Sequence, residues 1–229
     1  MVAVKGKRPY DSRRRAEQAR QTRAAVTEAA QRLFLRDGYA ATTIAAIATE
    51  AGVSPETIYK AFGGKPGLVR AICEQALAGE GPVPAETRSD HLQATEPDPR
   101  MIIRGWGELT AEIAPRISPI MLLLRAAAVA DPQAAGLWEE IDSGRLTRMT
   151  HNARHLGQAG HLREGITVEH AGEILWTYSS PELYELLVLR RHWAPAQYGA
   201  FIAEAMISAL LHPAAPTPSP GQRKAQPPW

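Results

Sequence analysis

The chemistry that this sequence can do is concentrated in three polar side chains, Thr57, Tyr59 and Lys60. They carry two hydroxyl groups and one ammonium group, which can bond to the base edges and phosphate oxygens of DNA. Ile58 and Phe62 form the opposite, apolar side of the same predicted helix. The three polar side chains therefore have no core to join, and they are candidates for binding rather than for catalysis.

Two short predicted helices joined by a glycine turn position these side chains. The first helix is marked by apolar residues at helical spacing, namely Ile44, Ile47, Ala48 and Ala51. Thr43 is placed to cap this helix and Gly52 to end it. Ser54 caps the second helix, and Pro55 takes its first position, where a missing N–H costs nothing. A helix-turn-helix of this size places its second helix in the major groove of DNA.

The stretch from Thr42 to Leu68 resembles the signature of the tetracycline-repressor (TetR) family of bacterial transcription regulators. The matching positions are Thr43-Ile44, Ile47-Ala48, Ala51-Gly52-Val53-Ser54, Thr57-Ile58-Tyr59, Phe62, Lys65 and Leu68. The resemblance implies an all-α dimer with an N-terminal DNA-binding domain and a C-terminal domain that binds a small-molecule effector, most often a repressor that the effector releases. It also implies that two late helices, near 167–178 and 195–211, pair with their symmetry mates as a four-helix bundle.

Further candidate DNA contacts flank the second helix. Lys65 begins the next predicted helix, where free backbone N–H groups form an anion site, and in the TetR family this corner contacts phosphate. Arg20 and Arg23 lie on the exposed side of the preceding helix and could reach backbone phosphates. The candidate DNA-binding residues are Thr43, Ser54, Pro55, Thr57, Tyr59, Lys60, Lys65, Arg20 and Arg23.

The charge of the chain is uneven along its length. The formal net charge is only +2 over 229 residues. Residues 1–70 hold 13 Lys and Arg against 6 Asp and Glu, whereas residues 71–229 hold 13 against 18. A basic head on an acidic body is typical of a nucleic-acid-binding domain attached to a solvated one. Residues 1–15 are basic and poor in apolar anchors, so we expect a disordered arm that either contacts phosphates or remains a solvated tail.

The sequence carries no phosphate-binding loop, dinucleotide fingerprint, nucleophile elbow or zinc-protease motif. His151 and His155 have a spacing that can hold a metal, but they lack an acidic or sulfur partner and fit an exposed helix face better. Cys73 has no second cysteine to pair with and is interpreted as a buried helix residue. We therefore expect no cofactor, no metal and no enzymatic activity.

Two features bear on location. The N-terminus lacks the apolar core of a signal peptide. The longest apolar run, near 120–130, is short and interrupted by Arg125, so it cannot span a bilayer. We expect a cytoplasmic protein without membrane contact.

The apolar pattern divides the chain into a head at residues 16–78 and a helical body at residues 97–212. Residues 79–99 are rich in proline, glycine and charge, which predicts a linker between them. Within the body the pattern predicts helices at 101–114, from Pro119 onward, at 131–157, 167–178, 182–193 and 195–211. The tail at 213–229 is rich in proline and is expected to be disordered.

Bulky apolar side chains on several helices of the body form either plain core or the wall of a cavity between helices. The candidate ligand-binding residues are Trp106, Met121, Leu124, Arg125, Trp138, Met149 and Trp176. Arg125 stands inside an apolar run. A buried charge needs a partner from the protein or from an anionic ligand, although this side chain could also extend to the surface.

The late helices supply the candidate dimer interface, because one recognition helix reads few base pairs and two heads need a symmetric dimer. The candidate interface residues are Ala171, Leu175, Ile202, Ala205, Met206 and Ala209. The expected partners are operator DNA, a small-molecule effector and a second copy of the chain. Two alternatives stay open: a helical small-molecule-binding protein or enzyme with a vestigial head, and an activator rather than a repressor.

Overall fold

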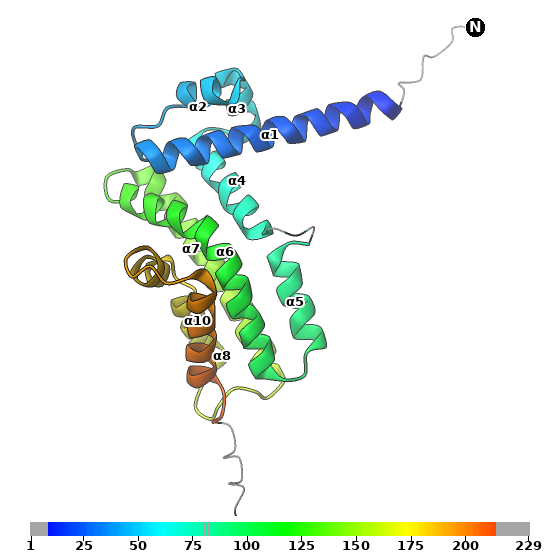
Figure 1. The fold of residues 1–229 in the computed structure, drawn as a ribbon, viewed down its shortest axis with the longest axis vertical. Helices are drawn as coiled ribbons and strands as arrows, with labels where there is room; N and C mark the ends of the chain where they lie inside the picture. Colours follow the sequence, from blue (N-terminus) through cyan, green and yellow to red (C-terminus); the bar gives the residue numbers. More distant parts are fainter. Residues whose placement is uncertain (1–8, 80, 82, 214–229) are drawn as a thin grey trace, which may run out of the picture.

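The computed structural model describes residues 9–79, 81 and 83–213. Every regular element among them is helical, which confirms the all-α prediction. The head at one end of the molecule contains α1 (Pro9–Asp37), α2 (Ile44–Ala51), α3 (Pro55–Phe62) and α4 (Lys65–Ala78) (Figure 1). The body contains α5 (Ala85–Thr95), α6 (Pro99–Ala127), α7 (Pro132–Gln158), α8 (Val168–Tyr178), α9 (Pro181–Tyr184), the π-helix η1 (Glu185–Leu189) and α10 (Pro195–Leu210).

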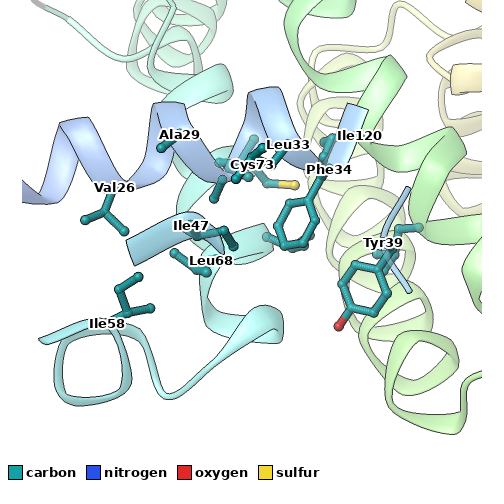
Figure 2. Packing of buried hydrophobic residues seen from close by; sticks show 14 of the residues in the cluster. Val26, Ala29, Leu33, Phe34, Tyr39, Ile47, Ile58, Leu68, Cys73 and Ile120 are labelled. Atoms are coloured by element: carbon teal, nitrogen blue, oxygen red, sulfur yellow. The ribbon is translucent and has the colours of Figure 1, made fainter. Parts of the chain in front are cut away.

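The core of the head packs α1 against α2, α3 and α4 (Figure 2). Its largest buried members in these helices are Val26, Leu33, Phe34, Ile47, Ile58, Leu68 and Ile72. The same apolar cluster continues through Ile120 and Leu124 of α6 and Leu137 of α7, all at most 2% exposed. The head therefore rests on the body through continuous apolar packing.

The helix-turn-helix has the local geometry that its sequence predicts. Thr43 Oγ1 accepts a backbone hydrogen bond at 3.1 Å and caps α2, and Gly52 ends α2 in the left-handed conformation at φ 67°. Ser54 Oγ accepts the backbone N–H of Thr57 at 3.3 Å, and Pro55 lies in the first turn of α3. Capping interactions within the motif thus fix where each helix begins and ends.

Helix α6 is continuous from Pro99 to Ala127, so the prediction of a separate helix starting at Pro119 is wrong. Pro115 and Pro119 both lie inside it. Each internal proline removes one backbone hydrogen bond and costs about 3 kcal/mol in an isolated helix. Packing against α10, α7 and α4 along its length outweighs this cost. Neither α6 nor any other helix in the described part of the chain is long and apolar enough to cross a bilayer.

Residues 79–99 contain helix α5, contrary to the linker predicted there. Its buried side is small and polar, formed by Ala85, Ser89 and Gln93, and α5 packs against α6 and α4. Gln93 Nε2 donates to Oδ1 of Asn152 on α7 at 3.3 Å. A helix buried through polar side chains has no apolar period, so the sequence pattern could not reveal it.

The first helix begins at Pro9, so residues 9–15 are helical rather than disordered as predicted. The residues from Arg13 to Arg20 are exposed, and this end of α1 extends beyond the rest of the head (Figure 1). Arginine, alanine, glutamate and glutamine are good helix formers, so the packed half of α1 propagates into this segment. The disorder predicted for residues 1–8 and 214–229 concerns residues outside those that the structure describes.

Two glycines bring α6 and α10 into backbone contact. A Cβ atom on Gly107 would lie 2.5 Å from the carbonyl oxygen of Gly199. A Cβ atom on Gly199 would lie 2.3 Å from the carbonyl oxygen of Gly107. These distances are too short for any side chain, so both positions require glycine. The body is thus built around a close pair of helices, and α6 also forms a wall of the cavity described below.

Candidate nucleic-acid interface and ligand cavity

The outer side of α3 is free in the structure. Ile58 is fully buried and anchors the helix, whereas Tyr59 is 57% exposed and Thr57 and Lys60 are exposed beside it. The hydroxyl groups of Thr57 and Ser54 lie 3.1 Å apart. We call Thr57, Tyr59 and Lys60 the reading surface. Its exposure agrees with the predicted placement of these side chains, and their contact with DNA stays a prediction.

The C-terminal end of α3 is held by residues that the sequence did not single out for this role. A Cβ atom on Gly67 in the first turn of α4 would lie 1.7 Å from the carbonyl oxygen of Phe62. The absent side chain lets α4 press directly on the last turn of α3. The Arg23 guanidinium lies 4.5 Å from the centre of the Phe62 ring and donates to the carbonyl oxygen of Ala61 at 3.3 Å. Helices α1 and α4 therefore fix the direction in which α3 projects.

Two of the predicted phosphate-binding cations are used inside the head. Lys65 Nζ donates to the carbonyl oxygens of Tyr39 at 2.8 Å and Ala40 at 3.4 Å, and lies 4.6 Å from the centre of the Tyr39 ring. Arg23 holds α3 as described above. Their ammonium and guanidinium groups stabilise the loop before α2 and the end of α3, and their contact with phosphate stays a prediction. Arg20 is exposed and pairs with Glu17 on its own helix.

A cavity of about 450 Å³ lies between the head and the body. It is walled by α4, α5, α6 and α7, with contributions from α8 to α10. Three of the predicted ligand-binding residues, Trp106, Met121 and Met149, line it. Cavities of this size hold drug-sized organic molecules. The structure therefore offers space for a ligand, and three of the seven predicted side chains lie at it.

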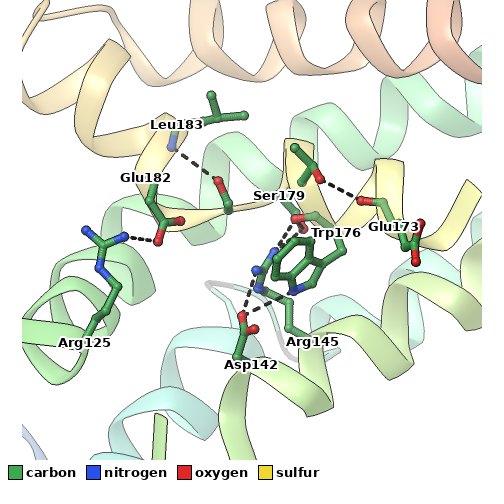
Figure 3. Close-up of polar contacts among 10 residues, drawn as sticks. Arg125, Asp142, Arg145, Glu173, Trp176, Ser179, Glu182 and Leu183 are labelled. Atoms are coloured by element: carbon green, nitrogen blue, oxygen red, sulfur yellow. Dashed lines mark hydrogen bonds and ion pairs between the residues drawn. The ribbon is translucent and has the colours of Figure 1, made fainter. Parts of the chain in front are cut away.

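The other four predicted ligand-binding residues lie elsewhere. Leu124 is buried in the core of the head, and Trp138 packs against that core. Arg125 is 43% exposed and pairs with Glu182 (Figure 3) and, at 4.0 Å, with Glu185. Of the two alternatives that the sequence left open, the side chain therefore extends to the surface. Trp176 lies behind the cavity wall and not in its lining. Side chains of similar type thus serve as core, surface or cavity wall, depending on the face of the helix that they occupy.

Trp176 belongs to a polar network around Arg145, a cavity residue that sequence reasoning missed (Figure 3). The Arg145 guanidinium stacks 4.7 Å from the centre of the Trp176 ring and donates to Asp142 at 2.8 Å and to Ser179 Oγ at 3.1 Å. Trp176 Nε1 donates to the same Asp142 oxygen at 3.3 Å. Burial lowers the pKa of Arg145, and the hydrogen bond to Asp142 opposes that shift. An isolated arginine on a polar helix carries no sequence signal for this role.

Residues 26–72 match the family model described as bacterial regulatory proteins, tetR family. This part of the chain is therefore similar to the N-terminal domain of TetR-family regulators. Over 62 residues it is 47% identical to the HTH-type transcriptional regulator TtgR of Pseudomonas putida, a match that covers 27% of this chain and 30% of TtgR. Among solved structures it is similar to native NalD of Pseudomonas aeruginosa (TM-score 0.64, 19% identity, 84% of this chain, 98% of that chain). It is also similar to SmeT in its triclosan complex, with a TM-score of 0.64 and 18% identity. That match covers 85% of this chain and 93% of the SmeT chain.

The similarity to curated sequences and the similarity to solved structures cover different parts of the chain. The chain spans only 30–38% of the length of the curated relatives it matches. The structures cover nearly the whole fold, but at under 20% identity they show the fold alone. The similarity to TetR-family sequences is thus confined to the head, and the body shares only its helical architecture with the solved structures.

Helix α4 connects the reading surface with the cavity. Its first turn presses on α3, and further along Arg70, Cys73 and Leu77 line the cavity. Arg70 also forms a two-pronged ion pair with Glu140 of α7, at 2.7 and 2.6 Å. This hydrogen bonding lowers the pKa of the Glu140 carboxyl and raises that of Arg70. A molecule in the cavity would therefore touch the helix that supports α3.

The remaining reactive side chains are inert or solvated. Cys73 is buried, and burial raises the pKa of its thiol to about 12, so it is protonated at neutral pH. His151 lies 3.5 Å from a carboxylate oxygen of Asp90. Across the described residues no three His, Cys, Asp or Glu side chains gather at a spacing that could hold a metal ion.

The six predicted dimer-interface residues fall into two groups, four that are buried within the protomer and two that are half-buried at its surface. Ala171, Leu175, Ile202 and Met206 are at most 2% exposed and belong to the protomer's own core. These four residues are therefore unavailable to a partner, because their faces of α8 and α10 pack inward. Ala205 and Ala209 are half-buried at the surface. Phe201 is 43% exposed on the same side of α10, its ring 5.5 Å from that of Trp193.

Proposed function

We propose that this protein is a dimeric, sequence-specific DNA-binding regulator, a repressor that a small molecule releases from its operator. One observation carries the proposal: α4 supports the helix with the reading surface at one end and lines a cavity of about 450 Å³ along its length. The reading surface binds the major groove. The backbone N–H groups at the start of α4 and the exposed arginines near the reading surface bind phosphates. The regulator acts in the cytoplasm and carries out no catalysis.

Two relatives of the same fold are described in terms that agree with this role. NalD is named as the secondary repressor of a multidrug efflux pump, and SmeT is seen in complex with triclosan. For this chain, a ligand in the cavity would displace α4 near Leu77 and turn α3 with it. The spacing of the two heads would then no longer fit two half-sites one helical turn apart. Linkage requires that ligand and operator weaken each other's binding by the same factor, about 5- to 150-fold in typical cases.

The proposal is tested by selecting DNA that the full-length protein binds from a random duplex library. We expect an inverted repeat whose half-site centres lie about one helical turn, or a multiple of it, apart. A reporter gene under a promoter containing the selected site should fall in expression when the protein is produced. Enrichment of no sequence would support a small-molecule-binding protein or enzyme with a vestigial head, and increased expression would support an activator.

The dimer surface gives a separate prediction. We propose that Phe201, Ala205 and Ala209 of α10 form the centre of a symmetric interface with a second copy. Replacing Phe201 and Ala205 together by glutamate should place like charges across the twofold axis and convert the dimer to monomers in sedimentation velocity at micromolar concentration. Val129→Glu, at a side chain that is 89% exposed, is the control and should leave the dimer intact. A wild-type monomer at this concentration, or a dimer unaffected by the double substitution, would contradict the assignment.

A further inference from the structure

We propose that Arg23 is a positioning residue for α3, and that it determines how well the protein distinguishes its operator from other DNA. The proposal rests on the function proposed above and deepens it, because it names a residue outside the reading surface on which sequence discrimination depends. Arg23 belongs to α1, and its contacts with α3 carry the proposal, together with the sparse anchoring of that helix.

Helix α3 is anchored to the rest of the head at few points. Of its eight residues, all of which the structure describes, only Ile58 is buried. Phe62, at the end of the helix, is half-buried and packs against the core of the head. A helix of about 12 Å that is fixed mainly near its middle can tilt about that point unless one end is held. The direction of α3 therefore depends on the contacts at its C-terminal end.

Arg23 reaches this end of α3 from another helix and makes two contacts there. Its guanidinium lies 4.5 Å from the centre of the Phe62 ring, and it donates to the carbonyl oxygen of Ala61 at 3.3 Å. The carbonyl groups in the last turn of a helix have no partner within that helix. A cation beside them is also favoured by the helix dipole. Arg23 thus acts as a C-terminal cap of α3 that is supplied by α1.

Helix α4 contacts the same end of α3. A Cβ atom on Gly67 would lie 1.7 Å from the carbonyl oxygen of Phe62, so the backbone of α4 touches the last turn of α3 directly. Glu74 of α4 lies 3.9 Å from Arg23, but the two side chains are 73% and 49% exposed, so this ion pair is weak. The close contacts of Arg23 are therefore those with α3, and the end of α3 is held by both α1 and α4.

The reading surface lies close to the end of α3 that Arg23 holds, because Tyr59 and Lys60 are within one turn of Phe62. A tilt of α3 would move their side chains relative to the bases. Hydrogen bonds to base edges need donor–acceptor distances of about 2.7–3.2 Å, so a displacement of about 1 Å breaks them. Attraction to phosphates is the same for every sequence and acts over about 10 Å, so it would change little. Loss of the Arg23 contacts should therefore weaken binding to the operator and spare binding to other DNA.

The test compares Arg23→Lys with the wild type in the full-length protein, by fluorescence anisotropy with the selected operator and with a random duplex of the same length. Lysine keeps the charge and can bind phosphate, but its ammonium cannot reproduce the planar stacking of a guanidinium. We expect operator affinity to fall about tenfold, or about threefold for each head of the dimer, and affinity for the random duplex to stay within about twofold. Arg36→Lys is the matched control, at an exposed arginine near the other end of α1 that pairs with Asp37, and it should change neither affinity.

A double-mutant cycle tests whether Arg23 acts through the end of α3. Phe62→Leu removes the ring on which the guanidinium stacks. If the two side chains act together, Arg23→Lys should lower operator affinity by no more than about threefold in the Phe62→Leu background, because the effects of coupled residues do not add. Circular dichroism of each variant shows whether the fold is intact.

Equal losses of affinity for the operator and for the random duplex would show that Arg23 binds phosphate, and would overturn the proposal. Unchanged operator affinity of folded Arg23→Lys would also overturn it, as would effects of Arg23→Lys and Phe62→Leu that simply add. A wild-type protein that enriches no DNA sequence would remove the proposed function and this proposal with it. A sequence-specific wild type whose discrimination is matched by Arg23→Lys would remove this proposal alone.

Discussion

Replacing Gly107 by alanine is expected to destabilise the protein by about 3 kcal/mol, the upper range for overpacking a well-packed core. The new Cβ atom would lie 2.5 Å from the carbonyl oxygen of Gly199, and the obstacle is backbone that no rotamer change can relieve. Helices α6 and α10 would have to separate along the most extensive helix pair in the described part of the chain. Urea unfolding followed by circular dichroism, at one fixed protomer concentration, measures the change.

Gly136→Ala is the matched control for this substitution. Gly136 lies on the exposed side of α7, and a Cβ atom there would meet nothing within 4 Å. Because alanine forms helices better than glycine, this variant should be more stable than the wild type by about 0.5–1 kcal/mol. If both variants unfold at the same urea concentration, the backbone contact between α6 and α10 is not as close as the structure places it.

Replacing Tyr59 and Lys60 together by alanine is expected to lower affinity for the selected operator by at least about a hundredfold. Base and phosphate contacts from such side chains are each worth about 1–3 kcal/mol, and a dimer loses them twice. Both side chains point away from the core, so the fold should be unaffected. Each lost phosphate contact should also reduce the slope of log affinity against log salt by about one. Fluorescence anisotropy with labelled operator at several salt concentrations measures both effects.

Arg154→Ala is the control for a lost surface charge, because Arg154 is exposed on α7 in the body, outside the head that carries the reading surface. It should leave operator affinity and its salt dependence nearly unchanged. The assignment of the reading surface would be wrong if the double variant bound the operator as the wild type does, or if Arg154→Ala weakened binding equally.

Local sequence signals were enough to predict the helix-turn-helix. Thr43, Gly52, Ser54 and Pro55 act on backbone groups within three or four residues, so their effect can be predicted without knowing what packs nearby. The burial of Ile58 and the exposure of Tyr59 follow from the same helical period. For this reason the exposed side of α3 was predicted correctly residue by residue.

Tertiary packing decided the elements whose local signals conflicted or were absent. Pro119 carries the signal for a helix start, yet contacts with three other helices keep α6 continuous through it. Helix α5 is buried through Ser89 and Gln93, which have no apolar period to reveal them. The contacts of Lys65 with the loop before α2 and of Arg23 with the end of α3 could not be predicted, because these partners lie far away in the sequence or on another helix.

Tertiary structure alone also separated core from cavity and from surface. Trp106 and Trp138 are alike in the sequence, but only Trp106 reaches the cavity, and Ile202 packs inward where a partner contact was expected. An apolar side chain gains the same free energy from burial against its own protomer, a ligand or a second copy. Periodicity therefore shows that a helix face is buried, and only the arrangement of the neighbouring helices determines what covers it.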